Sequence, residues 1–77
     1  MNLAFYTGKQ CHLCDLAQQL LEQDQHYSEL QIEKFDVSQD HNLYHLYGAR
    51  IPVIKRIDTE AELGWPFTAQ SLREFLG

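Results

Sequence analysis

The chain has 77 residues, of which 44% are hydrophobic and 22% charged, and its formal net charge is -5. This length suits one domain close to the lower limit at which a hydrophobic core alone holds a fold together, so we expect a single domain over residues 1–77. The acidic balance leaves no broad positive surface for phosphates or anionic lipid, so neither nucleic acid nor a membrane is an expected partner. No apolar run has the pattern of a secretory signal or approaches membrane-spanning length, which makes a cytoplasmic location the default.

The first predicted elements are a strand and an amphipathic helix. Leu3–Thr7 is an apolar run closed by Gly8, as expected for a buried strand. Beyond it, hydrophobic residues recur at the spacing of one helix face, with polar residues on the other face. The hydrophobic positions of this helix are Leu13, Leu16, Ala17, Leu20 and Leu21.

A second strand is predicted over residues 30–37. Its alternation changes phase between Ile32 and Phe35, which indicates a bulge or a strand end there. Ser38 is expected to cap a short helix that ends at Gly48. That helix is predicted to bury Leu43, Leu46 and Tyr47.

The last third of the chain predicts a hairpin and a final helix. A strand over residues 52–57 begins with proline, which sheets tolerate at the first position, and residues 58–61 form the turn to a return strand over 62–65. Thr68 caps a helix that ends at Gly77, with Ala69, Leu72, Phe75 and Leu76 on its inner face. The order β-α-β-α-β-β-α predicts an α/β fold with a four-stranded mixed sheet and helices on both of its faces.

The two cysteines, Cys11 and Cys14, stand at the predicted turn from the first strand into the first helix. In a reducing compartment, a lone pair of cysteines is more often catalytic or metal-binding than a permanent staple. Residues three apart in the first turn of a helix come within bonding distance, so a disulfide is accessible. The free N–H groups and the dipole of the helix N-terminus favour a thiolate at Cys11.

Three polar neighbours could tune this thiolate. A partly protonated His12 would favour the thiolate and make the disulfide more oxidising, and Lys9 would add positive potential. Asp15 suits a helix N-terminus but disfavours a neighbouring thiolate. For both His12 and Lys9 the alternative is a solvated surface side chain with no role.

The order of elements, the C-x-x-C at the first strand-to-helix turn and the triplet Arg50-Ile51-Pro52 together resemble the thioredoxin superfamily, and the small size is most similar to glutaredoxins. The segment Cys11-His12-Leu13-Cys14 is similar to that of a subgroup of short bacterial glutaredoxin-like proteins. This resemblance implies a thioredoxin-like fold of the glutaredoxin type. It also implies that Cys11 attacks disulfides and that Cys14 resolves the mixed disulfide.

The same resemblance implies a substrate groove beside the cysteines. Pro52 would be a cis-proline that shapes the groove, and Ile51 would offer its backbone to an extended substrate, with Arg50 next to it. Glutaredoxins hold glutathione with a glycine pair followed by an acidic residue, and the stretch Gly64-Trp65-Pro66-Phe67-Thr68 stands in its place here. We expect Gly64 and Trp65 to line the groove, with no cofactor, and glutathione as co-substrate is an open alternative.

The function predicted from these residues is a thiol–disulfide oxidoreductase that acts on a protein or small-molecule disulfide and is regenerated by a thiol reductant. Two alternatives come from other classes: a metal-binding module that uses both cysteines with His41 and His45, and a redox-inactive domain of the same fold. Tyr6, Trp65 and Phe67 also have two interpretations, since each could edge the site or belong to the core.

Overall fold

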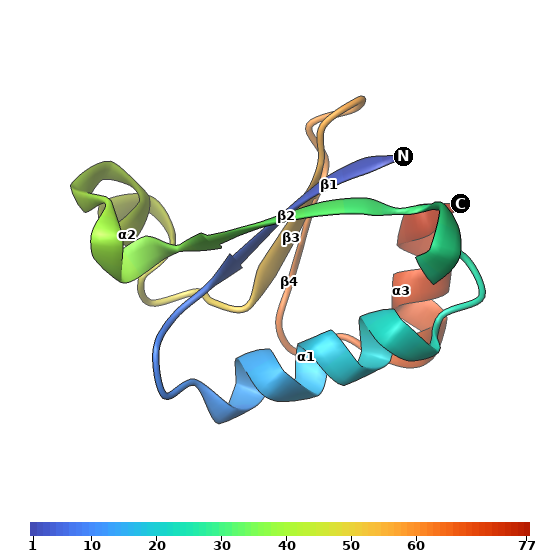
Figure 1. Ribbon diagram of the computed structural model, residues 1–77, viewed down its shortest axis with the longest axis horizontal. Coiled ribbons are helices and arrows are strands. Elements are labelled where there is room, and N and C mark those ends of the chain that lie inside the picture. The colour runs from blue at the N-terminus through green and yellow to red at the C-terminus, as the bar shows by residue number, and fades with distance from the viewer.

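The computed structural model describes residues 1–77 and contains one mixed sheet in the strand order β2-β1-β3-β4 (Figure 1). Strand β1 pairs in parallel with β2 and antiparallel with β3, and β4 pairs antiparallel with β3. The strands are β1 (Asn2–Thr7), β2 (Gln31–Asp36), β3 (Val53–Arg56) and β4 (Glu62–Gly64). The mixed four-stranded sheet predicted from the sequence is thereby confirmed.

Three α-helices and two short 3-10 turns connect the strands. The helices are α1 (His12–Gln23), α2 (His41–Tyr47) and α3 (Ala69–Leu76), and the turns are η1 (Tyr27–Glu29) and η2 (Val37–Gln39). In Figure 1, α1 and α3 lie together below the sheet, and α2 stands beyond the end at which β1 and β2 finish. None of the helices combines the length and apolar character needed to span a membrane.

The sheet separates two hydrophobic clusters, because successive residues of a strand point to opposite faces. Leu3 and Phe5 of β1 pack with α1 and α3 on one face, while Ala4 and Tyr6 pack with Val37 and the α2 side on the other. The larger cluster contains Leu3, Phe5, Ala17, Leu21, Ile54, Phe67, Leu72 and Leu76. Helices on both faces of the sheet were predicted, and this arrangement confirms them.

The irregularity predicted in the second strand is wrong. Asn2–Thr7 pairs with Gln31–Asp36 residue by residue, without a bulge. The phase change has another cause, because Ile32 packs against the cluster under α1 and α3 whereas Phe35 packs against the cluster under α2. A strand that contributes to both covered faces does not keep a simple alternation of apolar and polar residues.

The start of the second helix also differs from the prediction. Asp40 is its N-cap, and its Oδ1 accepts the N–H groups of Asn42 at 2.9 Å and Leu43 at 3.1 Å. Ser38 instead belongs to η2, where its N–H and hydroxyl both donate to Asp36 Oδ1. A carboxylate two residues closer to the helix therefore takes the capping role.

The prediction that Leu46 is buried is wrong as well, since it is 59% exposed. The α2 helix has only seven residues, and the face that carries Leu43 and Tyr47 is the one that meets the sheet. Leu46 is about 100° away from Tyr47 around a helix axis, so it leaves this face. Ala69 at the start of α3 is likewise exposed rather than on the inner face.

The predicted cap of the last helix is confirmed. Thr68 Oγ1 accepts the N–H of Ser71 at 3.1 Å, and Ser71 Oγ accepts the N–H of Thr68 at 2.9 Å, which completes a capping box. Leu72 and Leu76 are then buried one turn apart against the sheet. This cap fixes where the segment after β4 turns into α3.

Candidate active site

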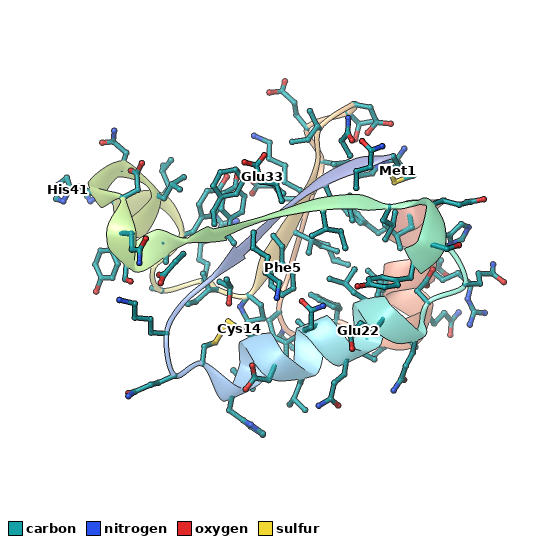
Figure 2. All side chains as sticks on the ribbon, in the orientation of Figure 1. Met1, Phe5, Cys14, Glu22, Glu33 and His41 are labelled. Atoms are coloured by element: carbon teal, nitrogen blue, oxygen red, sulfur yellow. A yellow bond between two sulfur atoms is a disulfide. The ribbon has the colours of Figure 1, made fainter.

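The two cysteines form a disulfide at the N-terminus of α1. Cys11 is the N-cap residue of the helix, Cys14 lies in its first turn, and their Cα atoms are 5.2 Å apart. The N–H of Cys14 donates to Cys11 Sγ at 3.1 Å, and the N–H of Asp15 donates to the carbonyl of Cys11 at 3.2 Å. Figure 2 shows the sulfur–sulfur bond at the start of the helix, beside the label of Cys14.

The two cysteines differ in their exposure to solvent. Cys14 is 4% exposed and lies on the helix face that also buries Ala17 and Leu21. Cys11 is half-buried, and the two residues between the cysteines, His12 and Leu13, are exposed. The helix register therefore leaves the first cysteine partly exposed and buries the second.

The segment before β3 lies at the same end of the sheet as the cysteines. Tyr6 near the end of β1 pairs with Val53 at the start of β3, so Pro52 is adjacent to the strand end from which the chain runs to Cys11. The peptide bond between Ile51 and Pro52 is cis, and Pro52 is buried. A Cβ on Gly8 would lie 2.7 Å from Ile51 Cδ1, which shows how closely this loop approaches the proline segment.

The backbone of Ile51 is only partly free. Its N–H donates to the carbonyl of Tyr47 at 3.0 Å, and the N–H of Arg50 donates to the same oxygen at 2.7 Å. No protein N–H donates to the carbonyl of Ile51. Of the backbone groups of Ile51, only this carbonyl is left for the contact with an extended substrate that the family resemblance implies.

The other residues expected to line the groove come from β4 and the segment after it. Gly64 is exposed and pairs with Val53, and the N–H of Trp65 donates to the carbonyl of Pro52 at 3.1 Å. The Trp65 ring meets Phe67 edge-on with the ring centroids 5.1 Å apart, and the Trp65–Pro66 peptide bond is also cis. Gly64 and Trp65 are thus brought next to Pro52.

Of the aromatic residues with two interpretations, two belong to the core. Phe67 is 6% exposed within the cluster under α1 and α3. Tyr6 is 8% exposed and lies between two rings on the α2 face, with its centroid 4.1 Å from that of Tyr47 and 5.5 Å from that of Phe35. Trp65 is half-buried, so one part of its ring packs on the core and another part faces solvent.

Sequence reasoning missed a polar network beside the proline segment. Tyr47 donates its hydroxyl to Glu62 Oε2 at 2.6 Å, and Arg50 donates to Glu62 Oε1 at 3.1 Å. The Arg50 guanidinium also lies over the Tyr47 ring, 5.4 Å from its centroid. The available signal was the hairpin register, in which Glu62 pairs with Lys55 and so faces the α2 side of the sheet.

This network shifts two pKa values in opposite directions. The hydrogen bond to Glu62, followed by burial and the carboxylate charge, raises the pKa of Tyr47 well above its ordinary 10.0. The hydrogen bonds from Tyr47 and Arg50 lower the pKa of Glu62 below its ordinary 4.5. The Glu62 contribution to stability is therefore present above pH 4.5 and lost as the pH falls through the lowered pKa, while the Tyr47 contribution is present below pH 10 and lost as the pH rises.

Lys9, His12 and Asp15 are all exposed around the helix start. The charge of Lys9 also acts on Asp36 at the end of β2, where hydrogen bonds from Ser38 are the main cause of a lowered carboxyl pKa and Lys9 adds to it.

The four residues of the metal-binding alternative do not come together. No group of three or more His, Cys, Asp or Glu side chains in residues 1–77 is arranged to hold a metal ion. Figure 2 shows His41 on the outer side of α2, away from Cys14. The i, i+4 spacing of His41 and His45 therefore places two histidines on one helix without bringing either to the cysteines.

A hollow of about 590 Å³ lies elsewhere on the molecule, over the first half of β1 and β2 on the α2 face of the sheet. Ala4, Tyr6, Glu33, Phe35 and Ile57 are among the residues that line it. The cysteines are on the helix that covers the opposite face. We place the candidate site at the partly exposed Cys11 rather than in this hollow, because disulfide exchange needs an accessible sulfur and not an enclosed cavity.

A two-cysteine turn at the start of the first helix, at the same end of a mixed four-stranded sheet as a cis-proline segment, defines a thioredoxin-like protein with a dithiol site. Residues 2–77 match the family model described as Glutaredoxin-like domain (DUF836), so the chain belongs to the glutaredoxin-like domain family. No curated protein matches the chain.

Solved structures with a similar fold are also found. The X-ray structure of the structural genomics target protein XcR50 from X. campestris has a TM-score of 0.84 and 35% identity, over 96% of this chain and 93% of that one. The solution structure of XcR50 gives 0.82 and 36%, over 99% and 92%. Thioredoxin 1 from Thermosipho africanus TCF52B has a TM-score of 0.73 at 14% identity, over 99% and 90%, and this likeness shows the fold alone.

Proposed function

We propose that this protein is a thiol–disulfide oxidoreductase in which Cys11 is the nucleophile and Cys14 the resolving thiol. The observation that carries the proposal is the position of Cys11 as N-cap of α1, half-buried and hydrogen-bonded to the N–H of Cys14, with Cys14 buried in the first turn. A thiolate at Cys11 keeps this N–H as a donor and the positive end of the helix dipole as a partner.

The reaction proceeds by two exchanges. The thiolate of Cys11 attacks one sulfur of the substrate disulfide, that bond breaks, and the other substrate sulfur leaves as a thiolate that takes a proton from solvent. Cys14 then loses its proton and attacks Cys11 Sγ, the mixed disulfide breaks, and the second substrate sulfur leaves. Two electrons pass to the substrate, and an external thiol reductant restores the pair.

The surroundings favour a peptide disulfide as the substrate. The carbonyl of Ile51 is free to accept from an extended backbone, and Gly64 leaves the adjacent surface uncovered. At the start of α3, Thr68 and Ser71 satisfy N–H groups that could otherwise hold a ligand carboxylate, which weighs against glutathione there. His12 and Lys9 are proposed to support the thiolate, and no cofactor takes part.

The proposal is tested by single-turnover reduction of a synthetic peptide with one internal disulfide. Fully reduced protein, freed of reductant, should convert one peptide disulfide per chain and acquire its own Cys11–Cys14 disulfide, as followed by mass spectrometry of both species. Protein that has been alkylated with iodoacetamide is the control and should leave the peptide oxidised. Peptide reduction no faster than by the same concentration of free cysteine would contradict the proposal.

A further inference from the structure

The segment between α2 and β3 carries the proposed substrate contacts but has no regular structure of its own. Its backbone is held on two sides. The N–H groups of Arg50 and Ile51 both donate to the carbonyl of Tyr47, and the carbonyl of Pro52 accepts from Trp65. These bonds fix the ends of the segment, but they leave the side chain of Arg50 without a restraint.

Glu62 supplies that restraint from the edge strand. Its two carboxylate oxygens have separate partners, since Oε2 accepts the hydroxyl of Tyr47 and Oε1 accepts from Arg50. These partners lie 15 and 12 residues away along the chain. One side chain of β4 therefore joins the last residue of α2 to the loop before Pro52.

The exposure of the three side chains indicates what the link does. Tyr47 is 7% exposed, so Glu62 gives the hydroxyl of a buried side chain its hydrogen-bond partner. The Glu62 and Arg50 side chains are 28% and 55% exposed, and an ion pair so open to solvent adds little to stability. What the pair does provide is orientation, because the guanidinium is held both by the carboxylate and over the Tyr47 ring.

We propose that Glu62 is a positioning residue that holds the Arg50-Ile51-Pro52 segment in the conformation that receives an extended disulfide substrate, without acting on the thiol. The proposal rests on the proposed oxidoreductase function. Loss of the carboxylate frees the Arg50 side chain and the hydroxyl of Tyr47, so a peptide that docks along the segment must reorder it on binding. The chemistry at Cys11 is unaffected, since no contact of Glu62 reaches the cysteines.

The test compares two disulfides in steady-state assays with dithiothreitol as reductant: the synthetic peptide and bis(2-hydroxyethyl) disulfide, which is too short to dock along the segment. Glu62→Ala should raise KM for the peptide roughly fivefold with kcat unchanged. KM for the small disulfide and the rate at which iodoacetamide alkylates reduced Cys11 should not change. A role in stability alone would lower the melting temperature without separating the two substrates.

Three further variants keep the test sharp. Glu62→Gln keeps an acceptor for the Tyr47 hydroxyl and should restore part of the peptide affinity. If Glu62→Ala does not fold, Tyr47→Phe takes its place in the test, because this variant removes only the hydroxyl. Glu33→Ala removes an exposed carboxylate from the same sheet face on the opposite edge and should change nothing. An unchanged peptide KM in Glu62→Ala, or an equal loss on both disulfides, overturns the proposal.

Failure of the oxidoreductase function gives a different result. If wild-type protein reduces neither disulfide, amide hydrogen exchange decides whether Glu62 holds the segment. Exchange at Ile51 should then be faster in Glu62→Ala than in wild type and unchanged in Glu33→Ala. Equal exchange rates at Ile51 in all three proteins would overturn the positioning role itself.

Discussion

Cys11→Ser should abolish disulfide exchange, whereas Cys14→Ser should complete the first attack and stop there. Cys11 is the partly exposed residue at the helix N-cap, and serine is far too weakly acidic to replace its thiolate at neutral pH. Without the Cys14 thiol, the mixed disulfide persists until the freed thiol of the peptide, or an external thiol, attacks it. Mass spectrometry of acid-quenched samples without reductant should therefore find the peptide joined to a fraction of the Cys14→Ser protein and no adduct on Cys11→Ser protein.

The assignment of roles depends on the difference between the two single variants. The double variant Cys11→Ser, Cys14→Ser is the control and should stay free of peptide. An adduct on Cys11→Ser that equals the one on Cys14→Ser would show that the buried sulfur is as reactive as the exposed one. The roles that we assign from exposure would then be wrong.

Leu21→Ala should cost about 2–5 kcal/mol of unfolding free energy, the range for truncation of a fully buried leucine. Leu21 has no exposed surface and packs in the cluster between the sheet, α1 and α3. Small domains are stable by only about 0.05–0.15 kcal/mol per residue, so this loss is a large part of the total. Urea denaturation followed by circular dichroism should show the midpoint fall steeply or the transition disappear.

Leu46→Ala is the matched control, since it makes the same chemical change at a leucine that is 59% exposed on α2. Its unfolding free energy should stay within about 0.5 kcal/mol of wild type. This pair also tests the burial pattern of α2, where the sequence predicted Leu46 inside. Similar losses for the two variants would contradict the packing described for this helix.

The sequence predicted the elements whose signals are local. Five hydrophobic residues at helical spacing indicate the first helix. Thr68 lies directly before the last helix, and Ser71 completes the capping box with it. The errors arose where two local signals compete or where burial depends on distant parts of the chain. Asp40 displaced Ser38 as N-cap, and Leu46 is exposed because α2 meets the sheet along one narrow face only.

In the candidate site, too, the sequence predicted the residues with a local signal and missed those that depend on distant parts of the chain. Cys11 and Cys14 could be identified because the pair lies within one turn and follows a strand directly. The link from Glu62 to Tyr47 and Arg50 could not, since it requires the hairpin register and the position of α2 at once. The spacing of hydrophobic residues also cannot show that the N–H of Ile51 already donates to the carbonyl of Tyr47.

The central claim, that Cys11 and Cys14 form a reversible redox couple, is tested most directly by a redox titration. Protein is equilibrated in buffers of varied ratio of reduced to oxidised glutathione, quenched with an alkylating agent, and weighed by mass spectrometry. The account predicts a single two-electron transition between a doubly alkylated dithiol and an unalkylated disulfide, complete in both directions. A pair that stays in one state across the whole range, or that ends only as glutathione adducts without the internal disulfide, would contradict it.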